Sequence, residues 1–190
     1  MSRLRLALVC LMAVGAGLTI RPVAAEVTEA STNGFTSTHT HTLALPPDEA
    51  WTLLTDGLNR WWDASHSYSA NPENLSLHLG ANGREGGCLC ERLDGGGWVE
   101  HLRVIFVQPG DTLRLQGALG PLVDMGLHGV MRWTLAPVEG SPDTTLFTSR
   151  YVVTGHLAGG FEQLAPVVDQ VNGGHFLRLE RIARGLPASE

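Results

Sequence analysis

Apolar and polar residues alternate with a period of two through most of the chain beyond residue 34, a pattern typical of half-buried β-strands. The first alternating run, 35–43, carries four threonines on one face, and β-branched residues favour strands. Further short runs follow, separated by glycine and proline, at 75–79, 87–93, 98–107, 112–118, 127–136 and 144–154. Short connections between several of these runs favour antiparallel hairpins. The pattern therefore predicts a meandering antiparallel sheet of about seven strands.

A helical pattern replaces this alternation in two regions. The sequence Pro46–Glu49 combines a stop with a helix start, which predicts a helix reaching residue 57 and a second short helix through 58–62. Between Phe161 and Ile182 apolar residues recur at spacings of three and four, which predicts one long amphipathic helix. Pro166 and the pair Gly173-Gly174 lie inside it, so we expect an irregular first turn and a weak point in the middle.

The first 25 residues have the features of a signal peptide. Arg3 and Arg5 precede an apolar run, and Val23-Ala24-Ala25 provides the small residues that signal peptidase accepts. We therefore expect export to the periplasm or the medium. The apolar run is shorter than the roughly 18 residues that a membrane helix needs, so no stable membrane anchor is expected. The expected organisation is a signal peptide at 1–25, a flexible arm at 26–34, a single α+β domain at 35–186 and a tail at 187–190.

Charge and composition exclude several classes of function. Without the three arginines of the signal peptide, 10 basic residues face 19 acidic ones, which gives a net charge of −9. No basic cluster is present to attract a phosphate backbone, so nucleic acid is not an expected partner. The chain contains no lysine, which excludes a P-loop lysine, a Schiff-base lysine and a Ser–Lys nucleophile. No cofactor is expected, and the oligomeric state is left open.

The order of elements, one strand, two helices, about six meandering strands and a long helix, resembles the helix-grip fold of the START and polyketide-cyclase superfamily. Five strings in the chain are also similar to this group: Leu45–Trp51, Trp61–Asp63 with His66–Tyr68, Gly86–Glu91, Gly120–Leu122 and Val168–Val171. Together they resemble an exported branch of the SRPBCC group that is named after the activator of the heat-shock protein 90 ATPase. Because lysine is absent, this name does not imply a nucleotide site in the chain.

The resemblance implies a cavity between the concave face of the sheet and the last helix. Such a cavity would hold a small, largely apolar ligand, with a few polar groups to orient it. The resemblance places His66 near the cavity mouth, and strand alternation supplies the other inward candidates. The expected ligand-contacting residues are His66, Cys88, Cys90, Leu102, Leu115, Met131, Trp133, Ser149 and Tyr151.

Cys88 and Cys90 have three interpretations: a disulfide, part of a metal site, or two buried thiols that face the cavity. In an extended strand, the Cβ atoms of residues two apart lie about 6.6 Å from each other, beyond the roughly 4.5 Å of ordinary disulfides. A bridge would therefore need a bulge in the strand. A zinc site would need two further ligands. The favoured interpretation is two small buried thiols.

The chemical candidates are Glu91, His101 and His66. One register of the hairpin across Gly95–Gly97 places Glu91 directly opposite His101. This carboxylate–imidazole pair could act as a general base, or could be a salt bridge on the face opposite the cysteines. His39 and His41 share a strand face, yet no third metal ligand is evident, so no metal site is expected.

Three functions are compatible with these features. The favoured one is an exported protein that binds or carries an apolar metabolite or lipid, which needs no catalytic residue. The second is a cyclase or dehydratase that uses a carboxylate–histidine pair at the cavity wall. The third is a protein-interaction domain that resembles a cochaperone, for which an exposed apolar patch would be the signature.

Overall fold

The computed structural model describes residues 26–80 and 86–189, so the expected signal peptide lies outside the described residues. Eight strands form one antiparallel sheet in the order β1-β2-β8-β7-β6-β5-β4-β3. The strands are β1 Glu26–Ser31, β2 Gly34–Leu43, β3 Leu75–His78, β4 Cys88–Arg92, β5 Trp98–Gln108, β6 Thr112–Gln116, β7 His128–Val138 and β8 Ser141–Thr154. The helices are α1 Pro47–Thr55, α2 Leu58–Trp61 and α3 Leu164–Ala183. This arrangement is the helix-grip fold, as the sequence predicted.

The eighth strand comes from the segment that was expected to be a flexible arm. Residues 26–31 form β1, which pairs with β2 through a register that is shifted between Val27 and Glu29. An edge strand of this kind needs only backbone hydrogen bonds to one neighbour, so it forms without the apolar alternation that identifies the central strands. The segment that was expected to be a flexible arm is therefore an edge strand, which a two-residue turn joins to β2.

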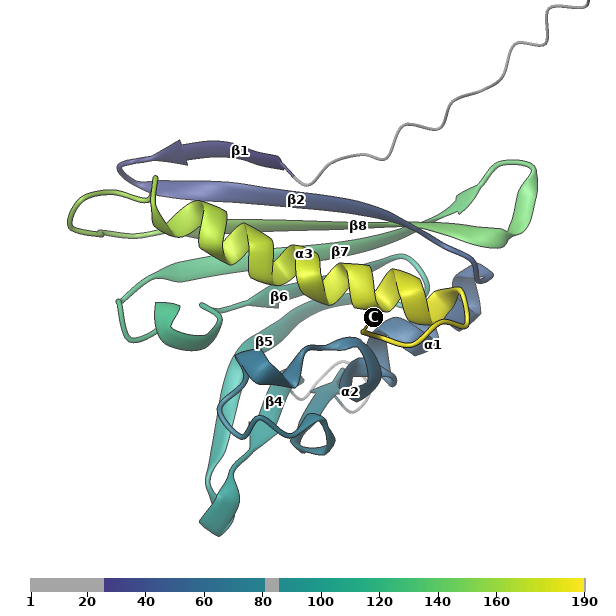
Figure 1. Ribbon diagram of the computed structural model, residues 1–190, viewed down its shortest axis with the longest axis horizontal. Coiled ribbons are helices and arrows are strands. Elements are labelled where there is room, and N and C mark those ends of the chain that lie inside the picture. Colours follow the sequence, from purple (N-terminus) through teal and green to yellow (C-terminus); the bar gives the residue numbers. More distant parts are fainter. Residues whose placement is uncertain (1–25, 81–85, 190) are drawn as a thin grey trace, which may run out of the picture.

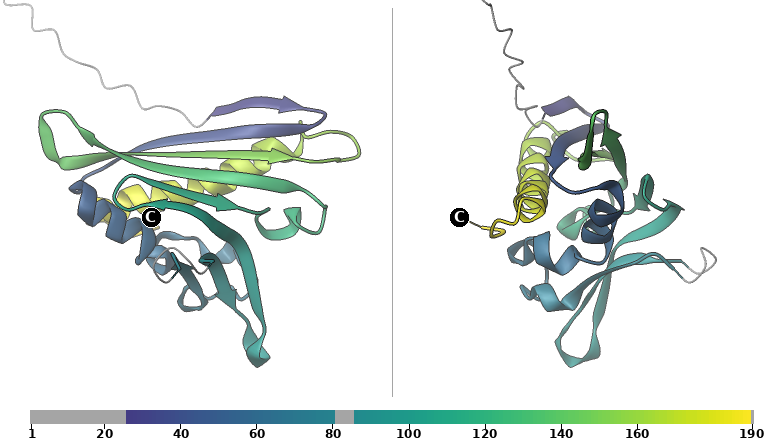
Figure 2. Two further views of the ribbon diagram at one scale, coloured as in Figure 1. Left: turned by 180° about the vertical axis from the view of Figure 1, so that it is seen from behind. Right: turned by 90° about the vertical axis from the view of Figure 1, so that its right-hand side faces the viewer.

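Helix α3 lies across the curved sheet, and α1 and α2 lie near its C-terminal end (Figure 1). Seen from its end, the helix occupies one side of the sheet only (Figure 2). The helix is continuous from Leu164 to Ala183, and Pro166 falls in its first turn, where a missing N–H removes no helical hydrogen bond. Gly173 allows close packing on β2, because a Cβ there would lie 3.0 Å from the His39 ring.

The core beneath the C-terminal half of α3 is filled by aromatic rings. Phe176 of α3 contacts Phe147 and Trp133 of the sheet, at ring-centroid distances of 5.1 and 6.2 Å. Trp61 of α2 completes this cluster 5.7 Å from Trp133. These four side chains are at most 1% exposed, so this part of the helix–sheet interface holds no space for a ligand.

No helix in the described part of the chain is long and apolar enough to span a membrane.

Candidate functional site

A cavity of about 380 Å³ lies beside the N-terminal half of α3. Its walls are mostly apolar, and they come from α3, from the segment after α2, from the loop before β7 and from β5. The lining residues are Trp62, His66, His101, Leu119, Gly120, Pro121, Leu122, Leu164, Val167, Val168, Val171, Asn172 and His175. An apolar wall with a few convergent polar groups is the usual character of a small-molecule site.

His101 reaches this cavity from β5 and is held from behind by Glu91 of β4. Its Nε2 atom lies 2.8 Å from Glu91 Oε2, and the carboxylate also accepts hydrogen bonds from the backbone N–H groups of Tyr68 and Ser69. Glu91 is 1% exposed and His101 is 8% exposed. Since a carboxylate can only accept, His101 donates through Nε2 and its Nδ1 is an acceptor in the neutral ring.

The environment of Glu91 keeps its carboxylate ionised. Burial alone would raise its pKa, but the hydrogen bonds from Ser69, His101 and Tyr68 outweigh burial and lower the pKa to about 2. A negative charge thus stands behind the imidazole at neutral pH. Such a charge fixes the orientation of the ring.

The sequence predicted contact between Glu91 and His101, and this contact is confirmed, but its geometry differs from the expectation. Glu91 pairs with Val99, not with His101, and the β4–β5 register shifts between Leu89 and Cys90. The shift leaves His101 as an extra residue on β5, so its ring meets Glu91 diagonally. Both side chains face inward, so the interpretation as an outer-face salt bridge is wrong.

His175 of α3 forms the floor of the cavity next to Trp62. Its ring stacks on Trp62 with centroids 4.1 Å apart, and its Nδ1 accepts a hydrogen bond from the Asp63 N–H at 3.0 Å. Burial, with the neighbouring His66 and Arg178, lowers its pKa to about 3 against the opposing effect of Asp63. His175 is therefore neutral at physiological pH, and its proton sits on Nε2 because Nδ1 accepts.

Asn172, one turn before Phe176, is the unusual polar residue of the cavity wall. It is 1% exposed, and its side-chain Nδ2 has no hydrogen-bond partner in the described part of the chain. A buried donor without a partner costs roughly 1–3 kcal/mol. Because Asn172 lines the cavity, a bound acceptor atom there would remove this cost.

Tyr151 positions the loop that forms one wall of the cavity. Its hydroxyl accepts a hydrogen bond from the Leu119 N–H at 3.1 Å and donates to the Gly117 carbonyl at 3.3 Å. Gly129 leaves room for the ring, since a Cβ there would lie 2.6 Å from Tyr151 Cε2. Burial raises the pKa of Tyr151 to about 12, with the Leu119 hydrogen bond acting in the opposite direction, so the hydroxyl stays protonated.

Of the expected ligand-contacting residues, only His66 lines the cavity. The others that face inward are packed in the core, where each is at most 1% exposed: Leu102, Leu115, Met131, Trp133, Ser149 and Tyr151. Their side chains face inward as expected, but none of them lines the cavity. Asn172, His175 and residues 119–122 were not anticipated as cavity residues, although Asn172 interrupts the apolar stripe of the predicted helix.

The two cysteines differ most from expectation. Cys88 and Cys90 form a disulfide with a Cα–Cα distance of 5.4 Å, and the β4–β5 pairing is shifted between Leu89 and Cys90, the irregularity that such a bridge requires. Leu89 and Glu91 are buried, whereas both cysteines are partly exposed. The cysteines therefore lie on the outer face of the sheet and do not face the cavity. A period-two pattern allows either phase, and the apolar character of cysteine favoured the wrong one.

A second histidine–carboxylate pair lies between β2 and α3. His39 Nε2 lies 3.0 Å from Asp169 Oδ1, and Ser37 Oγ donates to the same carboxylate oxygen at 2.6 Å. Burial lowers the pKa of His39, and Asp169 opposes that effect. No cavity described above includes these residues. No group of three or more potential metal ligands occurs in residues 26–80 and 86–189.

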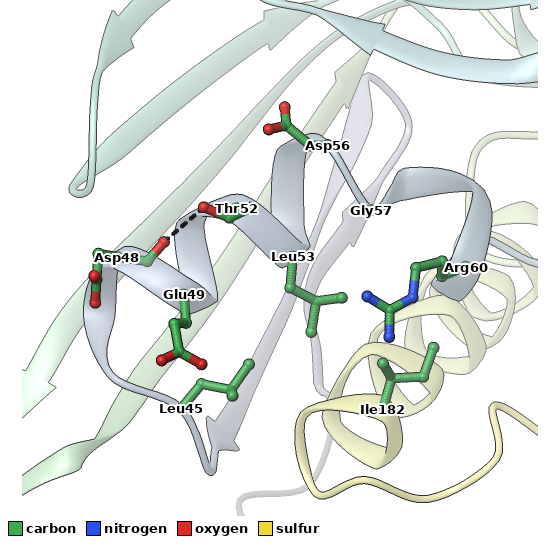
Figure 3. Close-up of a pocket in the computed structure, with 9 residues that line it drawn as sticks. All are labelled: Leu45, Asp48, Glu49, Thr52, Leu53, Asp56, Gly57, Arg60 and Ile182. Atoms are coloured by element: carbon green, nitrogen blue, oxygen red, sulfur yellow. Dashed lines mark hydrogen bonds between the residues drawn. The ribbon is translucent and has the colours of Figure 1, made fainter.

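Another hollow, of about 470 Å³, lies between α1 and the end of α3 (Figure 3). Leu45, Leu53 and Ile182 provide its apolar side chains, and charged residues of α1 and α2 surround them. Asp48 is tied into α1 by its carbonyl, which accepts a hydrogen bond from Thr52 Oγ1 at 3.0 Å. Exposed Glu49, Asp56 and Arg60 make this hollow less suited to an apolar molecule than the cavity beside the N-terminal half of α3.

Comparisons with known proteins identify the fold. No family model and no curated protein matches the chain. CalU16 from Micromonospora echinospora is similar in structure, with a TM-score of 0.54, 19% identity and 87% of each chain covered. A conserved protein of unknown function from Enterococcus faecalis, EF2215, has a TM-score of 0.55 and 13% identity over 83% of this chain and 75% of its own. A protein from Arthrobacter aurescens has a TM-score of 0.53 and 13% identity over 90% and 96%.

Proposed function

We propose that this protein binds a small, largely apolar molecule in the cavity beside the N-terminal half of α3. The observation that carries this proposal is the buried Asn172 amide, which has no partner among the described residues and lines an otherwise apolar wall. A ligand that places an acceptor oxygen beside Asn172 would pair this donor and fill the cavity at the same time.

The cavity walls also define the chemistry of the ligand. Val168, Val171 and Leu122 provide an apolar surface, whereas Asn172 and His175 offer N–H donors at the base. A volume of about 380 Å³ suits a compact molecule better than a long lipid chain. The ligand class is therefore an apolar metabolite with a carbonyl, ether or hydroxyl oxygen at one end.

Native mass spectrometry of the purified protein, followed by solvent extraction, tests this proposal. We expect a copurifying molecule in the natural host, and displacement of the fluorescent probe anilinonaphthalene sulfonate by that molecule. Val171→Phe fills the cavity and should abolish probe binding. Leu177→Phe places the same ring on an exposed position of α3, 53% exposed, and should leave probe binding unchanged. Equal probe binding by both variants would refute the site.

A second function, proton transfer on the bound molecule, is favoured by the Glu91–His101 pair. His101 touches the cavity, so it is the candidate catalytic residue, and Glu91 is a positioning residue behind it. His101→Gln should bind the copurified molecule but not convert it. Glu91→Gln should lower kcat more than it changes KM. Unchanged turnover in His101→Gln would leave binding as the function.

The proposal also includes export of the protein and its relationship to one branch of the SRPBCC group. We infer that residues 1–25 are removed and that the chain belongs to the exported branch that resembles activators of the heat-shock protein 90 ATPase. The mass of the secreted protein tests the first inference, since it should begin at Glu26. The cochaperone-like alternative has less support, because the exposed arginines Arg114, Arg132 and Arg150 on neighbouring strands interrupt the exposed apolar side chains of the outer sheet face, which are Phe106, Val130 and Leu146.

A further inference from the structure

The Cys88–Cys90 bridge contributes little to folding as a cross-link. A disulfide stabilises a protein mainly by restricting the unfolded chain, and this effect grows with the length of the closed loop. Here the cysteines are two residues apart on one strand, so the closed loop is very short. Both residues are partly exposed on the outer face of β4, where a reacting molecule can approach. Strained or exposed disulfides tend to be the labile ones.

The two sulfurs have different neighbours. The strand register places His78 of β3 and Arg103 of β5 directly opposite Cys88. Cys90 has Ser76 and Glu100 in the corresponding positions. Directly opposite residues share one face of a sheet and lie in side-chain contact range.

This difference in neighbours makes one sulfur the better leaving group. A thiolate is favoured beside an imidazole or a guanidinium and disfavoured beside a carboxylate. Arg103 and Glu100 pair with each other through two hydrogen bonds of 3.0 Å, so the carboxylate offsets part of the guanidinium charge, whereas His78 Nε2 lies 3.0 Å from the neutral Ser76 hydroxyl. When the bridge opens, Cys88 therefore leaves as the thiolate more readily than Cys90.

A surface groove exposes the other sulfur. The groove has a volume of about 350 Å³, and Cys90 belongs to its lining together with Ser76, His78 and Trp98. Trp98, at the edge of the groove, is 67% exposed and offers a large aromatic surface of the kind that contacts peptide partners. Cys88 does not line this groove, so a thiol that enters the groove meets Cys90.

We propose that Cys88–Cys90 is a redox-active disulfide that oxidises a dithiol, such as a protein with two free cysteines, through attack on Cys90. A substrate thiolate attacks Cys90 Sγ, the Cys88–Cys90 bond breaks, and its electron pair leaves on Cys88. The second substrate thiolate then attacks the substrate sulfur of the mixed disulfide and releases Cys90. The substrate gains a disulfide and loses two electrons, and its two protons end on Cys88 and Cys90.

This activity is independent of the small-molecule cavity. The cavity lies on the inner face of the sheet beside α3, whereas the bridge lies on the outer face. The dithiol probe is dithiothreitol, and tandem mass spectrometry after alkylation assigns each thiol. We expect reduction of Cys88–Cys90 to be at least about tenfold faster than that of oxidised glutathione, which lacks the neighbouring cation. A brief reaction with glutathione should place the mixed disulfide on Cys90.

Two arginine variants separate a functional site from a surface bridge. Arg103→Gln removes the cation opposite Cys88 and should slow reduction about fivefold. Arg150→Gln removes an exposed arginine from the same sheet face but away from the bridge, and should leave the rate unchanged. The proposal fails if the two variants react alike, if glutathione attaches to Cys88, or if reduction is no faster than that of oxidised glutathione.

Discussion

Beneath the C-terminal half of α3 the space to the sheet is filled with aromatic rings, whereas beside its N-terminal half the same interface opens into a cavity. Phe176 and Leu179 are at most 1% exposed in the filled half. In the open half Val167 is 59% exposed, and Val168 and Val171 line the cavity. The C-terminal half of α3 thus anchors the helix to the sheet, whereas the N-terminal half borders the cavity. Substitutions in the first half should mainly change stability, and substitutions in the second should mainly change ligand binding.

Two of the three histidine–carboxylate pairs among the described residues show a related contrast. Asp169 and Ser37 hold His39 between helix and sheet, whereas His101 lines the cavity with Glu91 behind it. The His39–Asp169 pair therefore joins the helix to the sheet, whereas the Glu91–His101 pair presents an imidazole to a molecule in the cavity. Burial of both partners does not by itself distinguish these roles; contact with the cavity does.

The largest expected effect lies in the filled half. Phe176→Ala removes a ring from the aromatic cluster and should lower the free energy of unfolding by about 3–5 kcal/mol. Leu177→Ala, at the next and exposed position, should change it by less than about 0.5 kcal/mol. Urea denaturation followed by tryptophan fluorescence measures both. Equal losses in the two variants would contradict the packed anchor.

Acid should destabilise the open half through two groups. The folded-state pKa of His175, about 3, lies below its ordinary 6.5, and that of Glu91, about 2, lies below 4.5. In both cases the unfolded chain binds more protons than the folded chain, so stability that is present at neutral pH is lost as the pH falls. The loss begins below the ordinary pKa of His175 and continues below the ordinary pKa of Glu91. The Glu91 shift corresponds to about 3 kcal/mol.

Variants separate these two pH windows. His175→Gln should flatten the fall in stability between pH 6.5 and about 3, the interval set by its two pKa values. Glu91→Gln should flatten the fall between pH 4.5 and about 2. Urea midpoints measured across this range check both, and a wild-type profile in either variant would show that the group named is not responsible.

A smaller effect is expected at the loop that walls the cavity. Tyr151→Phe removes the hydroxyl that bonds Leu119 and Gly117, and should cost about 1–2 kcal/mol of stability. The loop should also become more mobile, so probe affinity should fall while the aromatic cluster stays intact. Hydrogen exchange at the Leu119 amide measures the loosening. Unchanged exchange there would show that the hydroxyl does not hold the loop.

The smallest expected change in stability has the opposite sign. Asn172→Leu replaces the unpaired amide with an apolar group of similar size, and should raise the stability of the empty protein by about 1 kcal/mol. The same variant should bind the copurified ligand more weakly. Chemical denaturation and ligand titration of one preparation test the two halves of this statement, and a destabilised variant would contradict the unpaired amide.

Periodicity alone predicted most of the fold. The alternating runs became strands β2 to β8, and the stripe of spacings three and four became α3. Strand β1 was missed because an edge strand with polar residues carries no such pattern. The contact between Glu91 and His101 was predicted because only one turn separates them in the chain.

The cavity itself was harder to predict from the sequence. The prediction that Cys88 and Cys90 of β4 face inward was wrong, and Leu89 and Glu91 face inward instead. Alternation along the strand is compatible with either choice. Whether Trp133 lines a cavity or fills it depends on the rings of Trp61 and Phe176, which lie far away in the chain. Side-chain volumes across three elements decide this, and no local pattern records them.

An NMR titration of the valine methyl groups with anilinonaphthalene sulfonate tests directly whether the cavity beside α3 binds an apolar molecule. We expect shifts at Val168 and Val171, which line the cavity, and none at Val130, which is 41% exposed on the outer sheet face. Shifts at Val130 with none at Val168 and Val171 would place the apolar binding surface on the outer sheet face and rule out the cavity beside α3 as the binding site.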